Sequence, residues 1–112
     1  WHGMPYSRRV IPRATPILQE KVIDEAGNIV ELAIWRVPVG LRYRGGVRYR
    51  LAFIRRGERS PVVLYDNHHP KGDHRHVRGV QESYAFVDVD RLIADFVADV
   101  RHVTGARTWP ER

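Results

Sequence analysis

Residues 66–76, DNHHPKGDHRH, contain the side chains best suited to proton transfer. Four of the six histidines fall within nine positions there, beside two aspartates, a lysine and an arginine. An unperturbed imidazole has a pKa of about 6.5, so it can take or give a proton near neutral pH. Cleavage of RNA needs a base for the 2′-OH, an acid for the 5′-oxygen and cations for the phosphorane charge. The segment therefore predicts acid–base chemistry on a phosphodiester.

Each role in that chemistry has a candidate. His74 and His76 are predicted to act as acid and base, in an order that the sequence leaves open. Lys71 and Arg75 would stabilise the phosphorane, and Asp73 would orient one imidazole, with Asp66 as the other candidate for that role. The full predicted catalytic set is Asp66, Lys71, Asp73, His74, Arg75 and His76.

Two other interpretations of the segment stay open. His74 and His76 share a face if the chain is extended, and with Asp73 they form a set suited to a divalent metal ion. That alternative implies a metal-dependent nuclease, whereas the main hypothesis needs no cofactor. The spacing matches no helix-borne zinc motif. The second interpretation is a plain surface loop without chemistry, because Asp-Asn and Pro-Lys-Gly are typical of turns.

A block of arginines precedes this segment. The net charge is +6, and residues 36–59 carry eight arginines against Glu58 alone. Arginine binds phosphate through a planar fork and stacks on bases, so the block predicts a nucleic-acid-binding surface. The alternatives are a solvated basic face or an acidic protein partner. The predicted binding residues are Arg48 and Arg50 on one strand face, Arg42 and Arg44 if that strand extends back through Gly45-Gly46, and Arg78.

The hydrophobic pattern predicts strands followed by one helix. Expected strands are 17–23, 29–37, 47–55, 61–66 and 82–87, with 66–76 as a loop. Apolar residues then recur with helical spacing from Val89, with Asp88 as N-cap and Gly105 as the stop. We expect a single α+β domain, 17–112: a twisted antiparallel sheet of about five strands, with the C-terminal helix packed on one face. Residues 1–16 are expected to be an irregular basic arm, of which 1–3 are interpreted as an addition before a natural start at Met4.

Composition excludes several classes of protein. The 112 residues include no cysteine, which excludes a disulfide framework, a zinc ribbon and a thiol nucleophile. No apolar run approaches the ~18 residues that a membrane span requires. We therefore expect no membrane partner and a cytoplasmic location.

Several stretches together resemble the TumE family of toxins from toxin–antitoxin modules. They are LQEKVIDEAGNIVELAIWRVP (18–38), YRLAFIRRGE (49–58), LYDNHHPKGDHRH (64–76) and ESYAFVDVDRLIADFVADV (82–100). The resemblance covers about 18–103 and implies a toxin encoded beside a helix-turn-helix antitoxin. The family has a glutamate-containing segment where this chain has His68-His69-Pro70. The resemblance therefore carries over Asp66, Asn67, Lys71, Gly72, Asp73, His74, Arg75 and His76.

The residues and the resemblance lead to one main hypothesis: a toxin that cleaves RNA as an endoribonuclease. The expected partners are RNA and the cognate helix-turn-helix antitoxin, with the ribosome and a second copy of the chain as further candidates. The alternative from another class is a non-enzymatic module that binds nucleic acid or protein. Such a module would need the arginines but tolerate loss of the histidines.

Overall fold

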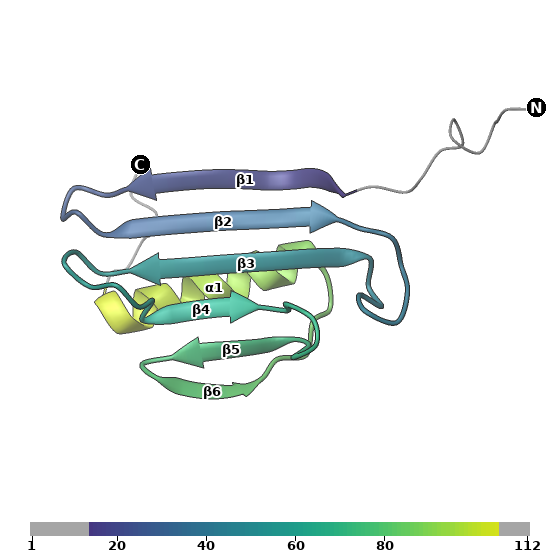
Figure 1. Ribbon diagram of the computed structural model, residues 1–112. Coiled ribbons are helices and arrows are strands. Elements are labelled where there is room, and N and C mark those ends of the chain that lie inside the picture. Colours follow the sequence, from purple (N-terminus) through teal and green to yellow (C-terminus); the bar gives the residue numbers. More distant parts are fainter. Residues whose placement is uncertain (1–13, 106–112) are drawn as a thin grey trace, which may run out of the picture.

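The computed structural model describes residues 14–105. Its six strands form one antiparallel sheet in sequence order, β1 to β6 (Figure 1). The strands are β1 Thr15–Ile23, β2 Ile29–Arg36, β3 Val47–Ile54, β4 Val63–Asp66, β5 His74–Val77 and β6 Val80–Ser83. The α+β prediction is confirmed, with six strands in the described residues in place of about five.

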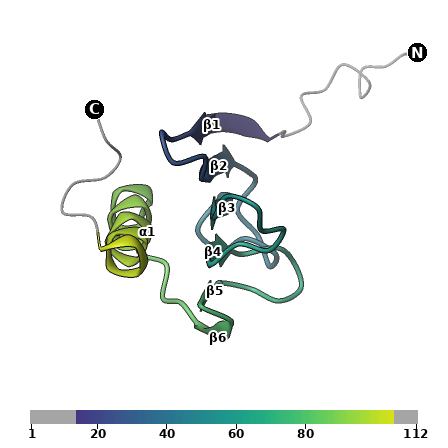
Figure 2. The same ribbon diagram turned by 90° about the vertical axis from the view of Figure 1, so that its left-hand side faces the viewer.

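A single helix in the described residues, α1 (Val89–Thr104), covers one face of this sheet (Figure 2). Its start is fixed by Asp88, whose carboxylate accepts a hydrogen bond from the Arg91 N–H at 2.8 Å. It ends at Gly105, whose φ of 73° is open to glycine without strain. None of the described residues forms a helix with the length and apolar character needed to cross a bilayer. Among them, no helix covers the opposite face, which we call the open face.

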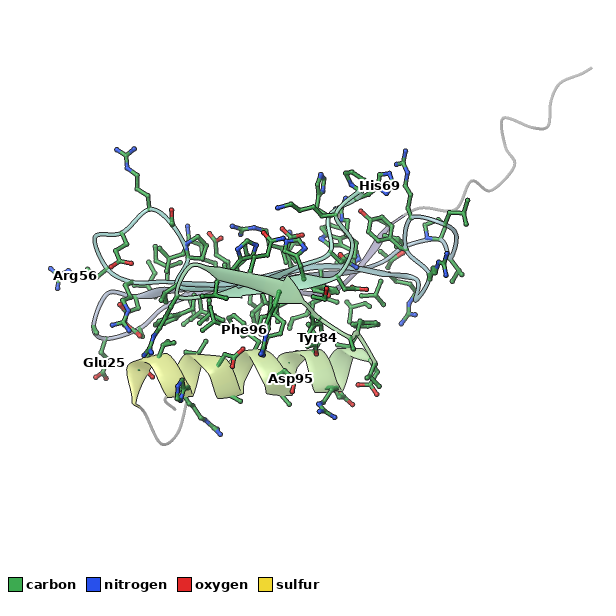
Figure 3. All side chains as sticks on the ribbon, turned by 90° about the horizontal axis from the view of Figure 1, so that it is seen from below. Glu25, Arg56, His69, Tyr84, Asp95 and Phe96 are labelled. Carbon is green, nitrogen blue, oxygen red and sulfur yellow. The ribbon has the colours of Figure 1, made fainter. Side chains whose placement is uncertain are left out.

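The core lies between the sheet and α1. In β3 every second side chain from Val47 to Phe53 points to the helix and is buried. The helix contributes apolar residues at helical spacing to the same core, and among them Phe96 is fully buried between the helix and the sheet (Figure 3). Each such apolar side chain contributes about 1.5–3 kcal/mol on burial. This packing fixes which side chains of each strand face the helix and which lie on the open face. The buried core is Val30, Ile34, Val47, Tyr49, Leu51, Phe53, Val63, Tyr65, Leu92, Phe96, Val100 and Val103.

The region after the fourth strand differs from the prediction. Residues 74–77, expected in a loop, form β5, and the expected strand 82–87 is replaced by β6, which ends at Ser83. The reason is a two-residue turn: Arg78 and Gly79 have φ of 51° and 83°, as a tight hairpin with right-handed strand twist requires. Val77 and Val80 pair across that turn.

The other strand bounds agree with the prediction within two residues. β1 begins at Thr15, so the last two residues of the predicted arm belong to the sheet. The rest of that arm, 1–13, lies outside the described residues.

Candidate catalytic row on the open face

Strand register places predicted site residues from three strands in one row. Arg50 pairs with Asp66, Asp66 pairs with His74, and His74 pairs with Ser83. Paired residues of an antiparallel sheet point to the same side. Val63 and Tyr65 of β4 face the helix, so Asp66 and its whole row lie on the open face. We call Arg50, Asp66, His74 and Ser83, together with His76 on the same face of β5, the candidate catalytic row.

His74 and His76 come together as the sequence predicts. Their rings are 5.1 Å apart between centroids and meet edge to face. The His74 Nδ1 lies 2.8 Å from the carbonyl oxygen of Gly72. A carbonyl only accepts, so Nδ1 carries a proton, and Nε2 is the ring nitrogen left to exchange a proton with a substrate. His74 is only 6% exposed, which holds this orientation.

His76 is the more exposed of the two imidazoles. Burial lowers its pKa below the ordinary value of 6.5, and the neighbouring charges of His74 and Lys71 lower it further. The carboxylate of Asp66 acts in the opposite sense. Lys71 reaches this region because its Nζ lies 3.4 Å from the amide oxygen of Gln81, which pairs with His76 in the sheet. The lowered pKa favours a neutral imidazole at pH 7.

The strand arginines flank the histidines on the open face. Arg50 forms an ion pair with Glu31 at 3.1 Å, and both side chains are substantially exposed. The guanidinium of Arg48 lies 6.0 Å from the ring centre of Trp35, its register partner on β2. An aromatic ring beside cations is the combination that holds a sugar–phosphate backbone and stacks a base.

Arg42 and Arg44 do not join the arginine row. They would join it only if β3 extended back through Gly45-Gly46. The strand instead begins at Val47, and Gly46, with φ of 71°, turns the chain. Both arginines lie in the loop 37–46 and line a pocket at the end of the sheet. Arg78 lies in the β5–β6 turn, at the opposite end of the sheet (Figure 1).

Arg75 lies on the helix face, apart from the histidines beside it in sequence. Its guanidinium donates to the Tyr65 hydroxyl and to Asp99 of α1, each at 3.1 Å. It also pairs with Glu82 of β6 at 2.5 Å. These partners, led by Tyr65, raise the pKa of Arg75. The arginine therefore ties β4, β5 and β6 to the helix.

The two predicted orienting aspartates have different surroundings. Asp73 accepts a hydrogen bond of 2.7 Å from the hydroxyl of Tyr49 and lines the pocket at the end of the sheet. Asp66 stands opposite His74, and its Oδ1 accepts the backbone N–H of His68 at 2.7 Å. Asp66 is thus the carboxylate placed beside the imidazoles.

The alternative metal set is not gathered into a site. In the part of the chain that the structure describes, no group of three or more His, Cys, Asp or Glu side chains is placed to hold a metal ion. Asp73 is directed to Tyr49, while His74 is directed to the Gly72 carbonyl.

Asn67 supports the site from within the sheet. Its Oδ1 accepts the Tyr49 N–H at 2.9 Å and its Nδ2 donates to the Val47 carbonyl at 2.8 Å. The side chain thus continues the β3–β4 ladder beyond the last strand residue, Asp66. Only the resemblance pointed to Asn67, because a buried asparagine leaves no periodic signal in a sequence.

The two remaining histidines of the cluster, His68 and His69, are exposed in the loop 67–73. His69 lies on the side of the sheet away from α1 (Figure 3). Its backbone N–H lies 3.5 Å from the Tyr43 hydroxyl, so this loop touches the loop 37–46.

Sequence reasoning missed Gln81 and Ser83, which extend the open face beside His76 and His74. The alternation of residues 74–83 around Arg78-Gly79 was the signal that could have found them.

Comparison with known proteins bears on this whole arrangement. No curated protein and no solved structure gives a significant match to the chain. A family model described as Toxin TumE matches residues 8–104, beginning ten residues before the resemblance noted from the motifs. The match includes every strand, the candidate catalytic row and the helix. The chain therefore belongs to the TumE family of toxins.

Proposed function

We propose that this toxin is an endoribonuclease that cleaves RNA by acid–base chemistry on the open face. The observation that carries the proposal is the contact between the rings of His74 and His76, beside Asp66 and Arg50 in adjacent strands. Two imidazoles with a carboxylate and a guanidinium supply the base, the acid and the charge that cleavage of RNA needs.

The reaction uses the 2′-OH of RNA as its nucleophile. One imidazole takes the 2′ proton while the 2′-oxygen attacks phosphorus and the bond from phosphorus to the 5′-oxygen breaks. The second imidazole enters the step protonated and donates that proton to the leaving 5′-oxygen, so the two imidazoles exchange protonation states over the reaction. The products are a 2′,3′-cyclic phosphate and a 5′-OH. The lowered pKa of His76 suits it to the base role at neutral pH.

Cations on the same face support binding and the transition state. Lys71 and Arg50 would hold the phosphorane charge, and Arg48 with Trp35 would hold the flanking strand. Arg75 has no part in this proposal, because its guanidinium is engaged with Tyr65, Asp99 and Glu82 on the helix side.

The test is cleavage of a structured RNA by the purified protein, with and without EDTA. We expect cleavage in EDTA, products that end in 2′,3′-cyclic phosphate, and protection of a bond whose 2′-OH is replaced by hydrogen. Loss of one acid or base lowers the rate by roughly 10²–10⁴-fold, so His76→Ala and His74→Ala should each cause a loss of that order.

The matched control is His69→Ala, an identical substitution at an exposed histidine of the neighbouring loop. It should retain the wild-type rate. Full activity in both His74→Ala and His76→Ala would refute the mechanism. Activity abolished by EDTA would assign the chemistry to a metal-dependent nuclease, and cleavage only of ribosome-bound RNA would make the ribosome a required partner.

A toxin family implies an antitoxin partner. We propose that the helix-turn-helix antitoxin binds the open face with an acidic segment, because Arg48 and Arg50 give that face exposed positive charge. Arg48→Glu and Arg50→Glu should together weaken the complex in a salt-dependent way. Unchanged binding of the antitoxin would place its interface elsewhere.

A further inference from the structure

A pocket of about 210 Å³ opens at the end of the sheet where β5 begins. Three connections leave the sheet at this end: the loop 37–46, the loop 67–73 and the segment between β6 and α1 (Figure 1). The pocket is smaller than the roughly 300–1,000 Å³ of sites for drug-sized ligands, and it suits one planar ring system. Its lining residues are Leu41, Arg42, Tyr43, Arg44, Gly45, Val47, Asn67, Gly72, Asp73 and Phe86.

Two aromatic side chains, Tyr43 and Phe86, line the pocket. Phe86 is held in place by stacking on Tyr49, with ring centroids 5.6 Å apart and an angle of 22° between planes. Gly45 permits this position, because a Cβ there would lie 3.2 Å from the Phe86 ring. Tyr43 lines the same pocket from the loop 37–46. A nucleobase that leaves its own stack commonly stacks on aromatic side chains of the protein.

Asp73 gives the pocket a directional polar group. The Tyr49 hydroxyl donates to its Oδ1 at 2.7 Å, while the carboxylate side chain remains exposed to the pocket. Burial, then the bond to Asp73, raises the pKa of Tyr49, so its hydroxyl stays a donor and fixes the carboxylate. An ionised carboxylate only accepts hydrogen bonds.

We propose that this pocket binds a guanine base of the RNA substrate, with Asp73 accepting from its Watson–Crick edge. Guanine presents two adjacent donors there, N1–H and the 2-amino group. Adenine and cytosine each place a ring nitrogen acceptor beside their amino group, and uracil flanks its single N–H with two carbonyl oxygens. A carboxylate is repelled by these acceptors, so guanine is the base that fits.

The pocket adjoins the proposed catalytic row. Gly72 and Asp73 both line the pocket, the Gly72 carbonyl binds the His74 Nδ1, and Asp73 directly precedes His74 in the chain. Arg42 and Arg44, which also line the pocket, offer charge to a neighbouring phosphate. This inference rests on the proposed action on RNA: the guanine would lie beside the cleaved bond and set its sequence preference.

Binding of uncleavable RNA tests the pocket without any cleavage. The probes are four 2′-O-methyl trinucleotides that carry G, A, C or U between two uridines, titrated into the full chain by calorimetry. We expect the G probe to bind at least about tenfold more tightly than the others, which corresponds to about 1.4 kcal/mol. Asp73→Asn should remove this preference, because an amide presents both a donor and an acceptor.

Asp90→Asn is the matched control, since Asp90 is an exposed aspartate in the first turn of α1. It should keep the preference for G. NMR signals of the wild-type protein provide a second test that needs no variant. Those of Tyr43, Asp73 and Phe86 should move on addition of the G probe.

Equal affinities for the four probes, preference for G retained in Asp73→Asn, or shifts confined to the open face would each overturn the proposal. The two proposals can fail separately. Preference for G in a protein that cuts no RNA would support the pocket alone, and cleavage with no base preference would support the catalytic row alone.

Discussion

Asp66 and His74 stand directly opposite each other on neighbouring strands of the open face. His74 in turn touches His76 edge to face, so the carboxylate acts on a pair of imidazoles. Among the charges that act on His76, Asp66 raises its pKa, while His74 and Lys71 lower it. Changing one of these neighbours can therefore raise or lower the pKa of His76, depending on which neighbour is changed.

Substitutions of those neighbours should move the pKa of His76 in opposite directions. Asp66→Asn removes the charge that favours imidazolium, so the pKa should fall below its wild-type value. Lys71→Gln removes a repelling charge, so the pKa should rise. Both shifts can be followed by the NMR titration of the His76 ring protons, with His69→Gln as a control that leaves them in place. Shifts of the same sign in both variants would contradict this account.

Acidification should reduce stability through His76. Its pKa in the folded state lies below the value of about 6.5 expected in the unfolded chain, so the unfolded state binds more protons between those two values. The resulting stability is present above pH 6.5 and is lost as the pH falls through the pKa of the folded state. Urea unfolding at pH 7.5 and 5.5 should show a smaller acid loss in His76→Gln than in wild type. An equal loss in both would show that other groups control it.

Replacement by glutamine should reduce stability at Arg75 and RNA binding at Arg50. Arg75→Gln removes the guanidinium shared by Tyr65, Asp99 and Glu82, and should lower the free energy of unfolding by about 1–2 kcal/mol while RNA binding persists. Arg50→Gln breaks one exposed ion pair, worth about 0–1 kcal/mol, and should leave stability nearly unchanged. The same variant should weaken RNA binding and reduce the salt slope by about 1. Urea unfolding and RNA titration at several salt concentrations measure both quantities. An Arg75→Gln variant with normal stability and poor RNA binding would reverse these assignments.

The long elements were predictable because their patterns are driven by burial. The alternation of β3 and the helical spacing from Val89 to Val100 each mark a face that packs against the other. The β5–β6 hairpin was missed because its strands are only four residues each, and Arg78 adopts a positive φ that arginine seldom takes. Composition alone made residues 66–76 resemble a loop.

The sequence did not predict which side chains of the site contact one another. His74, His76, Asp66, Arg48 and Arg50 reach one face because strand alternation and register are regular. Arg75 reaches the other face by the same alternation, which becomes visible only once 74–77 is known to be a strand. The bond from Tyr49 to Asp73 joins residues 24 positions apart, a contact that no local pattern encodes.

Arg78 should be replaceable by a residue that accepts its backbone conformation. Asparagine is enriched at positive φ, so Arg78→Asn should keep or raise stability, by up to about 1 kcal/mol. The substitution also removes a predicted contact to phosphate. If Arg78 contacts RNA, the salt slope of RNA binding should fall by about 1 while the fold is retained.

Gly79→Ala is the contrasting variant: a Cβ there meets no atom within 4 Å, so any loss of stability reports strain at its φ of 83°. Lower stability in Arg78→Asn would mean that the arginine side chain itself holds the turn.

Asn67 should contribute more to stability than any exposed residue of its loop. Asn67→Ala leaves the Tyr49 N–H and the Val47 carbonyl without their partner, and an unsatisfied buried group costs about 1–3 kcal/mol. We expect the free energy of unfolding to fall by roughly 2–4 kcal/mol, because both groups are lost together. The next residue provides the control: His68 is exposed, so His68→Ala should change stability by less than about 0.5 kcal/mol. Urea unfolding of both variants measures the difference. Equal stability would mean that water replaces the amide at the end of β4, and the strand ladder would then hold the candidate catalytic row without Asn67.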